Sequence, residues 1–185
     1  FDTRMKIVRS EDGMDRSIWQ QFAELGLLAA PFSEEMGGLD GGPVETMVIM
    51  EELGRGLVVE PYLPTIVLSG GILNRHGSAA QKEAHLPGII AGESIWALAF
   101  NEPQGRFNLA DIVTSARTES EGYVLNGAKA VVLGGPWADK LIVSARVSGD
   151  QRSRDGVGLF IVDKSADGVS TQDYPTVDGG RASEV

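Results

Sequence analysis

The sequence predicts an α+β fold, in which an N-terminal all-α helical domain at residues 1–92 precedes an antiparallel β-barrel or sandwich domain at residues 93–185. Three observations predict this order. Apolar residues recur at helical spacing through the first half of the chain. Short β-rich runs separated by turn residues fill the second half. No helical pattern lies between those runs, so we expect no crossover helices and no parallel sheet.

Composition limits the class of function. An apolar fraction of 42% is enough for a buried core, and a net charge of -10 argues against nucleic acid or an anionic membrane as a partner, because both require a basic surface. The same charge means that a phosphate-bearing ligand needs local cations or a partner chain. No apolar run is long enough to span a bilayer, and the first residues lack the shape of a signal peptide. Without Cys the chain forms neither disulfides nor thiolate metal sites, and we expect a cytoplasmic protein.

The first predicted helices lie before residue 60. Apolar residues from Ile18 onwards recur at helical spacing and indicate a helix that ends near Gly26. A second helix is predicted to begin at Pro43, because proline suits the first helical position, and to stop at residues 54–56, where two glycines flank an arginine.

Two more helical segments follow. An apolar stretch runs from Leu63 to Leu73 and halts near Gly77. Ser78 and Gln81 have the spacing of a capping box, which predicts the start of a fourth helix. We expect this helix to break at residues 86–88, which contain a proline followed by a glycine.

The second half contains a series of predicted strands. They are Trp96–Phe100, Ile112–Arg117, Tyr123–Leu125, Ala130–Leu133, Leu141–Arg146, Gly158–Val162 and Val169–Tyr174. The dipeptides Glu121-Gly122 and Asn126-Gly127 are strong turn signals between them. Residues 176–185 resemble a loop that leads into another strand, so we expect the second domain to be incomplete at its C-terminal end. Because Phe1 is not an initiator Met, we also expect the chain to be a fragment.

Several standard sites fail on spacing. Gly122 and Gly127 are spaced as in a phosphate loop, but Ala128 stands where that loop requires lysine. No glycine fingerprint of a dinucleotide-binding fold follows a strand, and Ser69 lacks the preceding glycine of a nucleophile elbow. His76 and His85 lie near helix ends, where we expect structural or surface roles, and no metal site is predicted.

The turn at Asn101-Glu102-Pro103 is a better candidate for a site. Pro103 restricts Glu102 to extended geometry and stiffens the turn. Asn101 places an amide donor and acceptor at the end of an apolar strand, where ligand sites are commonly built. The residues alone leave two interpretations open, a ligand site or a capped β-turn. Lys129, just after a hairpin turn, is either part of such a site or a solvated cation.

Six segments, in order, resemble the N-terminal and middle domains of acyl-CoA dehydrogenases. The resemblance covers nearly the whole chain and depends on this order more than on any one motif. The segments are Trp19–Leu28 with Pro31, Glu34–Gly38, Glu51–Arg55, Gly77–Lys82 with Leu86-Pro87 and Ala91–Glu93, Ala97–Pro103, and Tyr123–Lys129.

The resemblance implies an enzyme of fatty acid or sterol degradation. Family members use FAD to oxidise the Cα–Cβ bond of an acyl-CoA to a trans-2-enoyl-CoA, pass electrons to an electron-transferring flavoprotein and form homo- or hetero-oligomers. Their base is a Glu in a C-terminal four-helix domain that is absent here, so no catalytic residue is predicted and Glu102 is expected to be structural. The cofactor-binding residues implied by position are Phe100, Asn101, Arg106, Phe107, Val131, Val132 and Leu133.

Some of these positions depart from the family pattern. Asn101 replaces the usual Thr, Phe107 stands where a flavin-contacting Ser is expected, and residues 131–133 replace a Trp-Ile-Thr run that stacks on and bonds to the flavin. The pattern is similar to the bacterial branch in which two different dehydrogenase subunits pair and one has a degenerate flavin site. An alternative function is therefore a non-catalytic partner subunit, and a third is a plain α+β binding module.

Overall fold

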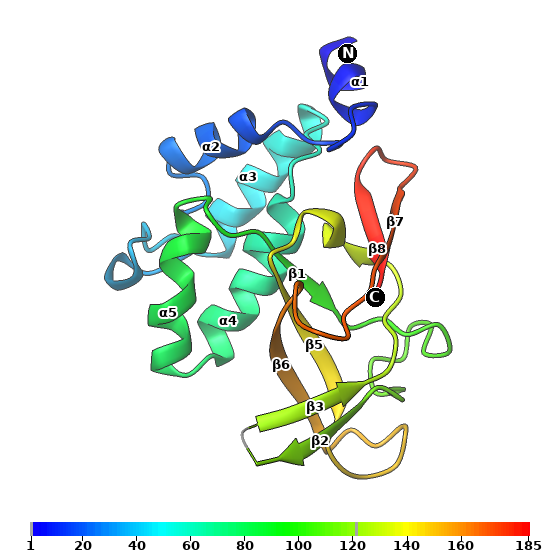
Figure 1. Ribbon diagram of the computed structural model, residues 1–185. Coiled ribbons are helices and arrows are strands. Elements are labelled where there is room, and N and C mark those ends of the chain that lie inside the picture. Colours follow the sequence, from blue (N-terminus) through cyan, green and yellow to red (C-terminus); the bar gives the residue numbers. More distant parts are fainter. Residues whose placement is uncertain (1, 121) are drawn as a thin grey trace.

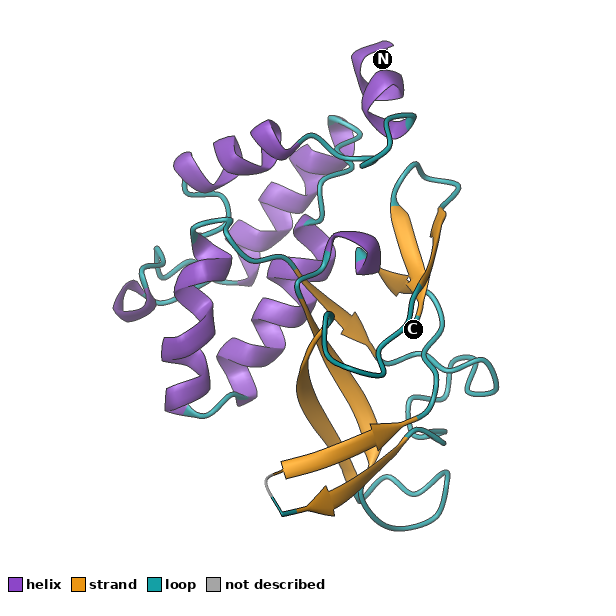
Figure 2. Ribbon diagram, in the orientation of Figure 1, coloured by secondary structure: helices purple, strands orange, loops and turns teal. Residues whose placement is uncertain are grey.

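The helices of the first half lie on one side of the molecule and the strands of the second half on the other (Figure 1, Figure 2). The computed structural model describes residues 2–120 and 122–185. Its helices are α1 (Asp2–Val8), α2 (Arg16–Glu24), η1 (Glu34–Met36), α3 (Pro43–Arg55), η2 (Leu63–Gly70), α4 (Gly71–His76), α5 (Ala79–Ile90) and η3 (Gly135–Trp137). This order of helices before strands confirms the α+β class.

Helices α2 and α3 lie where the pattern predicts them. Asp15 caps α2 by accepting a hydrogen bond from the backbone N–H of Ser17, and Pro43 opens α3. Helix α1 has no buried residue and was not predicted, because no amphipathic pattern marks it.

The predicted break of the fourth helix at residues 86–88 is wrong. Helix α5 begins after the Ser78 cap, as expected, but continues through Pro87 to Ile90. Proline removes one backbone donor from the helix. Leu86 and Ile89 are fully buried on either side of it, so packing of this last turn outweighs the missing hydrogen bond.

The segment before α4 is a π-helix, η2, rather than an ordinary helical turn. Its Thr65 side chain is buried, donates to the carbonyl of Trp96 at 3.0 Å and accepts from the Trp96 N–H at 3.3 Å. The helical layer is thereby bonded to the first strand. π-Helices occur often at functional sites. The position of η2 therefore makes the strand ends beside it a candidate site.

The strands form two sheets. Their bounds are β1 (Trp96–Ala99), β2 (Ser115–Glu119), β3 (Gly122–Asn126), β4 (Val132–Leu133), β5 (Lys140–Arg146), β6 (Val157–Asp163), β7 (Gln172–Pro175) and β8 (Arg181–Glu184). The larger sheet has the order β1-β5-β2-β3, with β6 on the other edge of β5. The smaller sheet has the order β4-β8-β7. These are open sheets, which fits a sandwich, and the described strands form no closed barrel.

The expectation of a purely antiparallel architecture is wrong at β5, which has two parallel neighbours. Strand β1 runs parallel to β5, with Trp96 opposite Lys140, and β2 meets β5 in parallel at a single pair. The chain returns to β5 through β2, β3, β4 and the short 3₁₀ turn η3 rather than through a long crossover helix, so the absence of a predicted helical crossover did not exclude parallel pairing. The turn signal Glu121-Gly122 involves Glu121, which lies outside the described residues.

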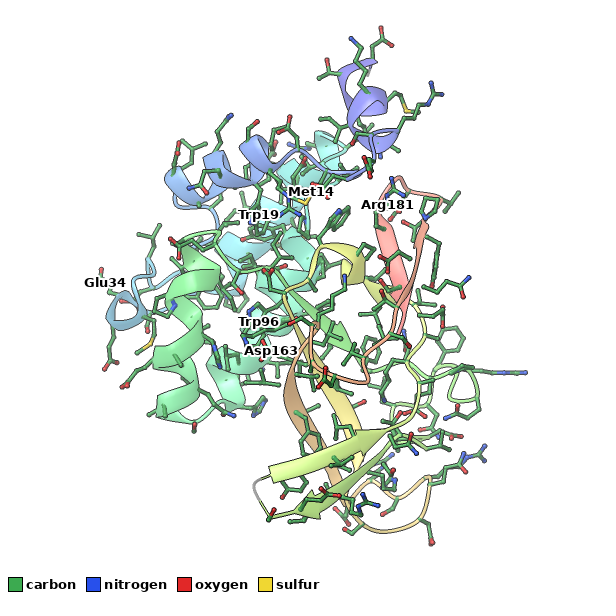
Figure 3. The ribbon with its side chains drawn as sticks, viewed as in Figure 1. Met14, Trp19, Glu34, Trp96, Asp163 and Arg181 are labelled. Atoms are coloured by element: carbon green, nitrogen blue, oxygen red, sulfur yellow. The ribbon has the colours of Figure 1, made fainter. Side chains whose placement is uncertain are left out.

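The main hydrophobic core lies between the helices and the larger sheet. It contains Trp19, Tyr62 and Ile66 from the helical half and Trp96, Trp137 and Ile142 from the strand half. The side chains of Trp19 and Trp96 point into this layer (Figure 3). A second cluster, which includes Ala97, Val132 and Val143, lies deeper in the strand half. The division of the chain into domains near residue 92 stays a prediction, and these halves share one core.

Within residues 2–120 and 122–185 no helix combines the length and the apolar character needed to cross a membrane.

Candidate functional site

The ends of β1 and β4 meet at the predicted cofactor site. Ala130 donates its backbone N–H to the carbonyl of Asn101 at 2.9 Å, which joins the turn after β1 to the residues before β4. Lys129 and Val185 exchange two backbone hydrogen bonds, of 2.7 and 2.8 Å, so the last described residue secures the same segment. We call the outward surface formed by Phe100, Asn101, Val131 and Leu133 the wall.

Asn101 is the polar group of the wall. Asn101 is half-buried, and its backbone carbonyl accepts a hydrogen bond from Ala130. Its side-chain amide makes no hydrogen bond with any other described residue. A half-buried amide that lacks a partner retains both a donor and an acceptor for a ligand. Among the described residues the Asn101 side chain caps no turn, and the ligand-site interpretation stays a prediction.

Val131 has a strained backbone. Its φ angle is 53°, in the left-handed region that β-branched residues avoid at a cost of about 1–3 kcal/mol. The Glu184 carboxylate accepts the Val131 N–H at 3.3 Å and the Tyr174 hydroxyl at 2.8 Å, and so holds this geometry. The Val131 side chain is 45% exposed and Leu133 38%, so both point outward. Such strain is concentrated at functional sites.

Val132 points the other way. Its side chain is 1% exposed and belongs to the deeper core cluster with Ala97 and Val143. Successive side chains alternate between the two faces of a strand, so an inward Val132 accompanies the outward Val131 and Leu133. A contact between Val132 and a cofactor stays a prediction, and it is restricted to the backbone.

Arg106 and Phe107 lie on the same connection between β1 and β2 as Asn101, a few residues further along the chain. Phe107 is 101% exposed, and Arg106 has a φ of 49°. Within the described chain neither side chain makes a hydrogen bond. The roles of these two residues toward a cofactor stay predictions.

The loop that carries them is nevertheless fixed at its base. Arg146 is buried at the end of β5, and its guanidinium donates only to backbone carbonyls. The acceptors are Ala110 at 2.8 Å, Gln151 and Asp155 at 3.0 Å, Ser153 at 3.1 Å, Ile112 at 3.3 Å and Ser148 at 3.4 Å. Two loops, before β2 and after β5, are thus tied to one side chain.

Asp111 reinforces the same base. Its carboxylate accepts from Gln151 Nε2 at 2.6 Å and from Arg152 Nε at 2.7 Å. These two bonds hold the pKa of Asp111 below its ordinary value.

A buried ion pair lies behind the wall. Lys129 Nζ donates to Glu102 Oε1 at 2.6 Å and to the Ser144 hydroxyl at 3.1 Å. The side chains of Lys129 and Glu102 are 3% and 1% exposed. Lys129 is therefore no solvated cation, and that alternative is wrong. The expected structural role of Glu102 agrees with its position in this network.

The pKa values of the pair reflect burial and hydrogen bonding. Burial acts to raise the pKa of Glu102, but bonds from Lys129, Thr114, Val113 and Gln104 outweigh it and lower that pKa to about 2. Burial also lowers the pKa of the Lys129 ammonium, and the Glu102 carboxylate partly offsets this. Glu102 is thus ionised at neutral pH and is held as an acceptor, which makes it unsuited to accept a proton.

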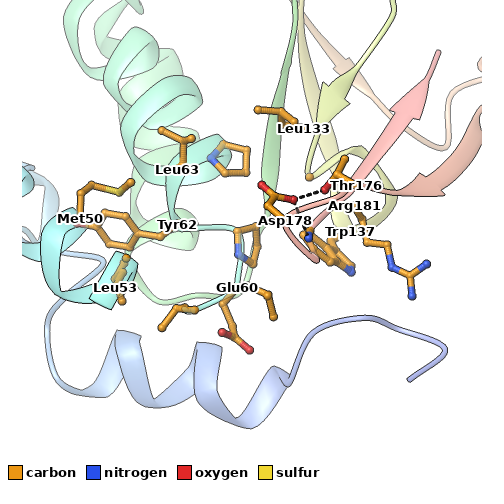
Figure 4. Close-up of a pocket in the computed structure, with 17 residues that line it drawn as sticks. Met50, Leu53, Glu60, Tyr62, Leu63, Leu133, Trp137, Thr176, Asp178 and Arg181 are labelled. Atoms are coloured by element: carbon orange, nitrogen blue, oxygen red, sulfur yellow. Dashed lines mark hydrogen bonds between the residues drawn. The ribbon is translucent and has the colours of Figure 1, made fainter. Parts of the chain in front are cut away.

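An apolar cavity of about 220 Å³ opens beside the wall (Figure 4). It lies between the start of η2, the end of β4 and the turn between β7 and β8. Its apolar lining includes Met50, Leu53, Leu63, Pro64, Leu133 and Trp137, and its polar lining includes Thr176, Asp178 and Arg181. Leu133 belongs to both the wall and the cavity, so the two surfaces adjoin at this residue.

Tyr62 and Gly134 shape this cavity. The Tyr62 hydroxyl donates to the carbonyl of Leu27 at 3.1 Å, and burial raises its pKa to about 12, so the phenol stays neutral. Gly134 has a φ of 71°, and a Cβ placed there would lie 2.8 Å from Cγ of Pro64. The π-helix therefore packs directly on the backbone that follows Leu133.

His85 has an aromatic neighbour in the core. The ring of His85 lies 5.0 Å from that of Trp96, and burial lowers its pKa, as in a structural histidine. Among the residues with assigned positions, no group of three potential ligands could hold a metal ion.

Sequence reasoning missed the main tertiary features of the site. Nothing local signals the strain at Val131 or the cavity lining at Asp178 and Arg181. The pairing of Glu102 with Lys129 also lacks a periodic signal, although both residues lie in segments that carry the family resemblance.

Comparison with known families matches both halves of the chain. Residues 3–93 match the family described as "Acyl-CoA dehydrogenase, N-terminal domain", and residues 97–185 match "Acyl-CoA dehydrogenase, middle domain".

Individual relatives agree with these matches. Acyl-CoA dehydrogenase FadE29 from Mycobacterium tuberculosis is 31% identical over 164 residues, which covers 89% of this chain and 42% of that protein. Mitochondrial isovaleryl-CoA dehydrogenase from Pongo abelii is 38% identical over 160 residues, with 84% and 38% covered. The chain thus spans about two fifths of the length of the curated relatives it matches.

Solved structures show the same fold. A variant of the Tcur3481-Tcur3483 steroid ACAD has a TM-score of 0.86 and 32% identity, covering 97% of this chain and 47% of that one. The ChsE4-ChsE5 complex from Mycobacterium tuberculosis has a TM-score of 0.85 at 26% identity, with 99% and 47% covered. The FAD complex of PigA has a TM-score of 0.88 at 25% identity, with 99% and 48% covered.

Proposed function

The chain belongs to the acyl-CoA dehydrogenase family, and from that premise we propose that it is part of an FAD-dependent enzyme that oxidises the Cα–Cβ bond of an acyl-CoA to a trans-2-enoyl-CoA. The described residues would supply the wall against which the flavin lies and part of the acyl pocket. The observation that carries the proposal is the wall itself, a surface with one free amide beside an apolar cavity.

The residues of the wall fit a flavin. Asn101 offers an amide whose donor and acceptor are free for the polar edge of the ring. Phe100, Val131 and Leu133 offer the apolar contact that a flat aromatic ring needs, and Val132 contributes backbone. Bound FAD would supply the hydride acceptor for the β-hydrogen of the substrate.

The cavity suits the acyl group. Its lining next to Leu133 is apolar, and a pocket that excludes water strengthens any hydrogen bond made to a thioester oxygen nearby. A volume of about 220 Å³ is consistent with a small acyl portion within the described residues alone.

Other parts of the reaction would come from outside these residues. We propose that the base is a carboxylate of a further domain, since Glu102 is held as an ionised acceptor in the core.

We also propose an electron-transferring flavoprotein as electron acceptor, a homo- or hetero-oligomer, a cytoplasmic location, and two domains that divide near residue 92. The net charge of -10 supports an oligomer, because the diphosphate of FAD needs cations beyond Arg106 on this loop.

A specific observation favours a second candidate. The Val131 N–H is already taken by Glu184, and neither Val131 nor Leu133 has a hydroxyl or a large ring to offer a flavin. The chain would then be a non-catalytic subunit that shapes the acyl pocket of a paired dehydrogenase, and the similar structures Tcur3481-Tcur3483 and ChsE4-ChsE5, each of two proteins, support this candidate.

The test uses the full-length protein that contains these residues. We expect it to be yellow as purified and to oxidise acyl-CoA with an artificial electron acceptor. Loss of the Asn101 amide in Asn101→Leu should weaken FAD binding by about tenfold, because one hydrogen bond to the ring is lost. A colourless, inactive protein contradicts the first proposal.

Co-expression with a second dehydrogenase subunit separates the two candidates. Flavin in stoichiometric amount in both subunits excludes the non-catalytic role. Flavin confined to the other subunit, with activity only in the complex, supports it.

A further inference from the structure

We infer that the Lys129–Glu102 ion pair is a positioning element that holds the two edges of the wall in register for the flavin. The inference rests on the proposed function, because it assigns these residues a role toward the same cofactor. Neither residue contacts the outward surface, since their side chains are 3% and 1% exposed. They act through the residues beside them.

The pair joins four separate segments of chain. Glu102 belongs to the turn after β1, and its carboxylate accepts from the backbone N–H of Val113 at 2.8 Å and of Thr114 at 3.2 Å, just before β2. Lys129 precedes β4, and its ammonium reaches Ser144 on β5 at 3.1 Å. Gln104 Nε2 adds a fourth donor to the carboxylate at 2.8 Å.

Each charged residue lies within two positions of a residue of the wall. Asn101 precedes Glu102, and Val131 lies two residues after Lys129. Side chains alternate along extended chain, so burying Glu102 turns Asn101 outward. The Ala130 N–H also bonds to the Asn101 carbonyl at 2.9 Å, so the ion pair and this backbone bond together hold the turn after β1 against the residues before β4.

Stability alone does not require a buried ion pair at this position. A buried ion pair replaced by apolar groups of similar size often leaves a protein as stable as before, so a pair of this kind serves best where a unique arrangement matters. The Lys129 ammonium and its acceptors define one direction and one distance, whereas apolar side chains in the same volume can shift against each other.

The test separates positioning from folding. In the full-length protein, Glu102→Gln with Lys129→Met keeps the volume of the pair and an acceptor for the Val113 and Thr114 amides but removes both charges. We expect a melting temperature close to that of the parent protein. The Kd for FAD should rise about tenfold, as when one hydrogen bond to the ligand is misaligned, and the resolved shoulders of the flavin absorption band should broaden.

The matched control is Lys140→Met. Lys140 pairs with Asp163 on β5 and β6, is only partly buried, and is not bonded to any residue of the wall. Its Kd for FAD and flavin spectrum should equal those of the parent protein. A double variant with unchanged Kd and spectrum overturns the positioning role, and so does a control that shifts them equally.

A milder variant covers the case in which the double variant does not fold. Ser144→Ala removes only the second bond of Lys129 and leaves the ion pair intact. We expect a two- to threefold rise in the Kd for FAD, which corresponds to roughly a part of the free energy of one hydrogen bond. An unchanged Kd overturns the inference. A parent protein that takes up no FAD overturns the proposed function, and the inference with it.

Discussion

At the scale of single residues, the site depends on side chains that carry charge or strain where the protein interior usually has neither. Glu102 is ionised although it is buried, because several donors converge on its carboxylate. Val131 keeps a left-handed backbone although it is β-branched, because Glu184 holds its N–H. Val131 lies in the wall and Glu102 lies directly behind it, where a fixed arrangement is needed.

The pKa of Glu102 leads to a pH-dependent prediction. In the folded protein it is lowered from 4.5 to about 2, so the ionised carboxylate contributes stability that is present above pH 4.5 and is lost as the pH falls through the folded value. In Glu102→Gln the free energy of unfolding should fall by about 3 kcal/mol at pH 7, and the difference from the parent protein should shrink toward pH 2.

Urea unfolding at a series of pH values measures this difference. Glu119→Gln is the control, since Glu119 pairs with Arg117 on the surface and should change stability by less than about 0.5 kcal/mol. A Glu102→Gln deficit that stays constant from pH 7 to pH 2 would contradict the assignment.

At the scale of elements, the contact between η2 and β4 places the cavity against the wall. Pro64 of the π-helix lies on the backbone at Gly134, directly after Leu133. The sequence predicted an apolar helical segment at η2 but not that it would be a π-helix. It also predicted a strand at β4 but not that the strand would be only two residues long. The close approach exists because position 134 has no Cβ.

Gly134→Ala should therefore be costly. The added Cβ would lie 2.8 Å from Cγ of Pro64, and the φ of 71° disfavours any side chain. We expect a loss of about 2–4 kcal/mol in the free energy of unfolding, the sum of left-handed strain and overpacking. The matched control is Gly54→Ala in α3, where a Cβ meets nothing within 4 Å and helix propensity should add about 0.5–1 kcal/mol of stability. Denaturant midpoints of the two variants that move in the same direction would contradict this reading.

At the scale of the whole molecule, one core joins the helices to the larger sheet. Trp137 lies in that core, and its indole N–H donates to the carbonyl of Asp12 at 2.6 Å, so a residue after β4 is bonded to the chain before α2. The cavity is built across this junction, and Leu133 of the wall lines it. Their geometry therefore depends on the halves folding together.

Trp137→Ala should destabilise both halves at once. We expect a loss of about 3–5 kcal/mol, as for a buried tryptophan, and helix and strand signals that disappear in one shared transition. Far-UV circular dichroism and tryptophan fluorescence during urea unfolding measure this. Phe107→Ala is the control, because Phe107 is fully exposed and should change stability by less than about 0.5 kcal/mol. Two separate transitions in the parent protein would contradict a shared core.

The sequence by itself determined the order of helices before strands, the start of α3 at Pro43, the cap of α5 at Ser78 and the family, because each depends on neighbouring residues or on motifs in a fixed order. Tertiary structure alone decided that α5 passes through Pro87 and that β1 runs parallel to β5. It also decided which predicted site residues face outward, since burial of Val132 and pairing of Lys129 with Glu102 are contacts between distant segments. The periodicity of apolar residues does not show which distant segments come into contact. The free energy of these contacts can also exceed the helix and strand propensities of the residues involved.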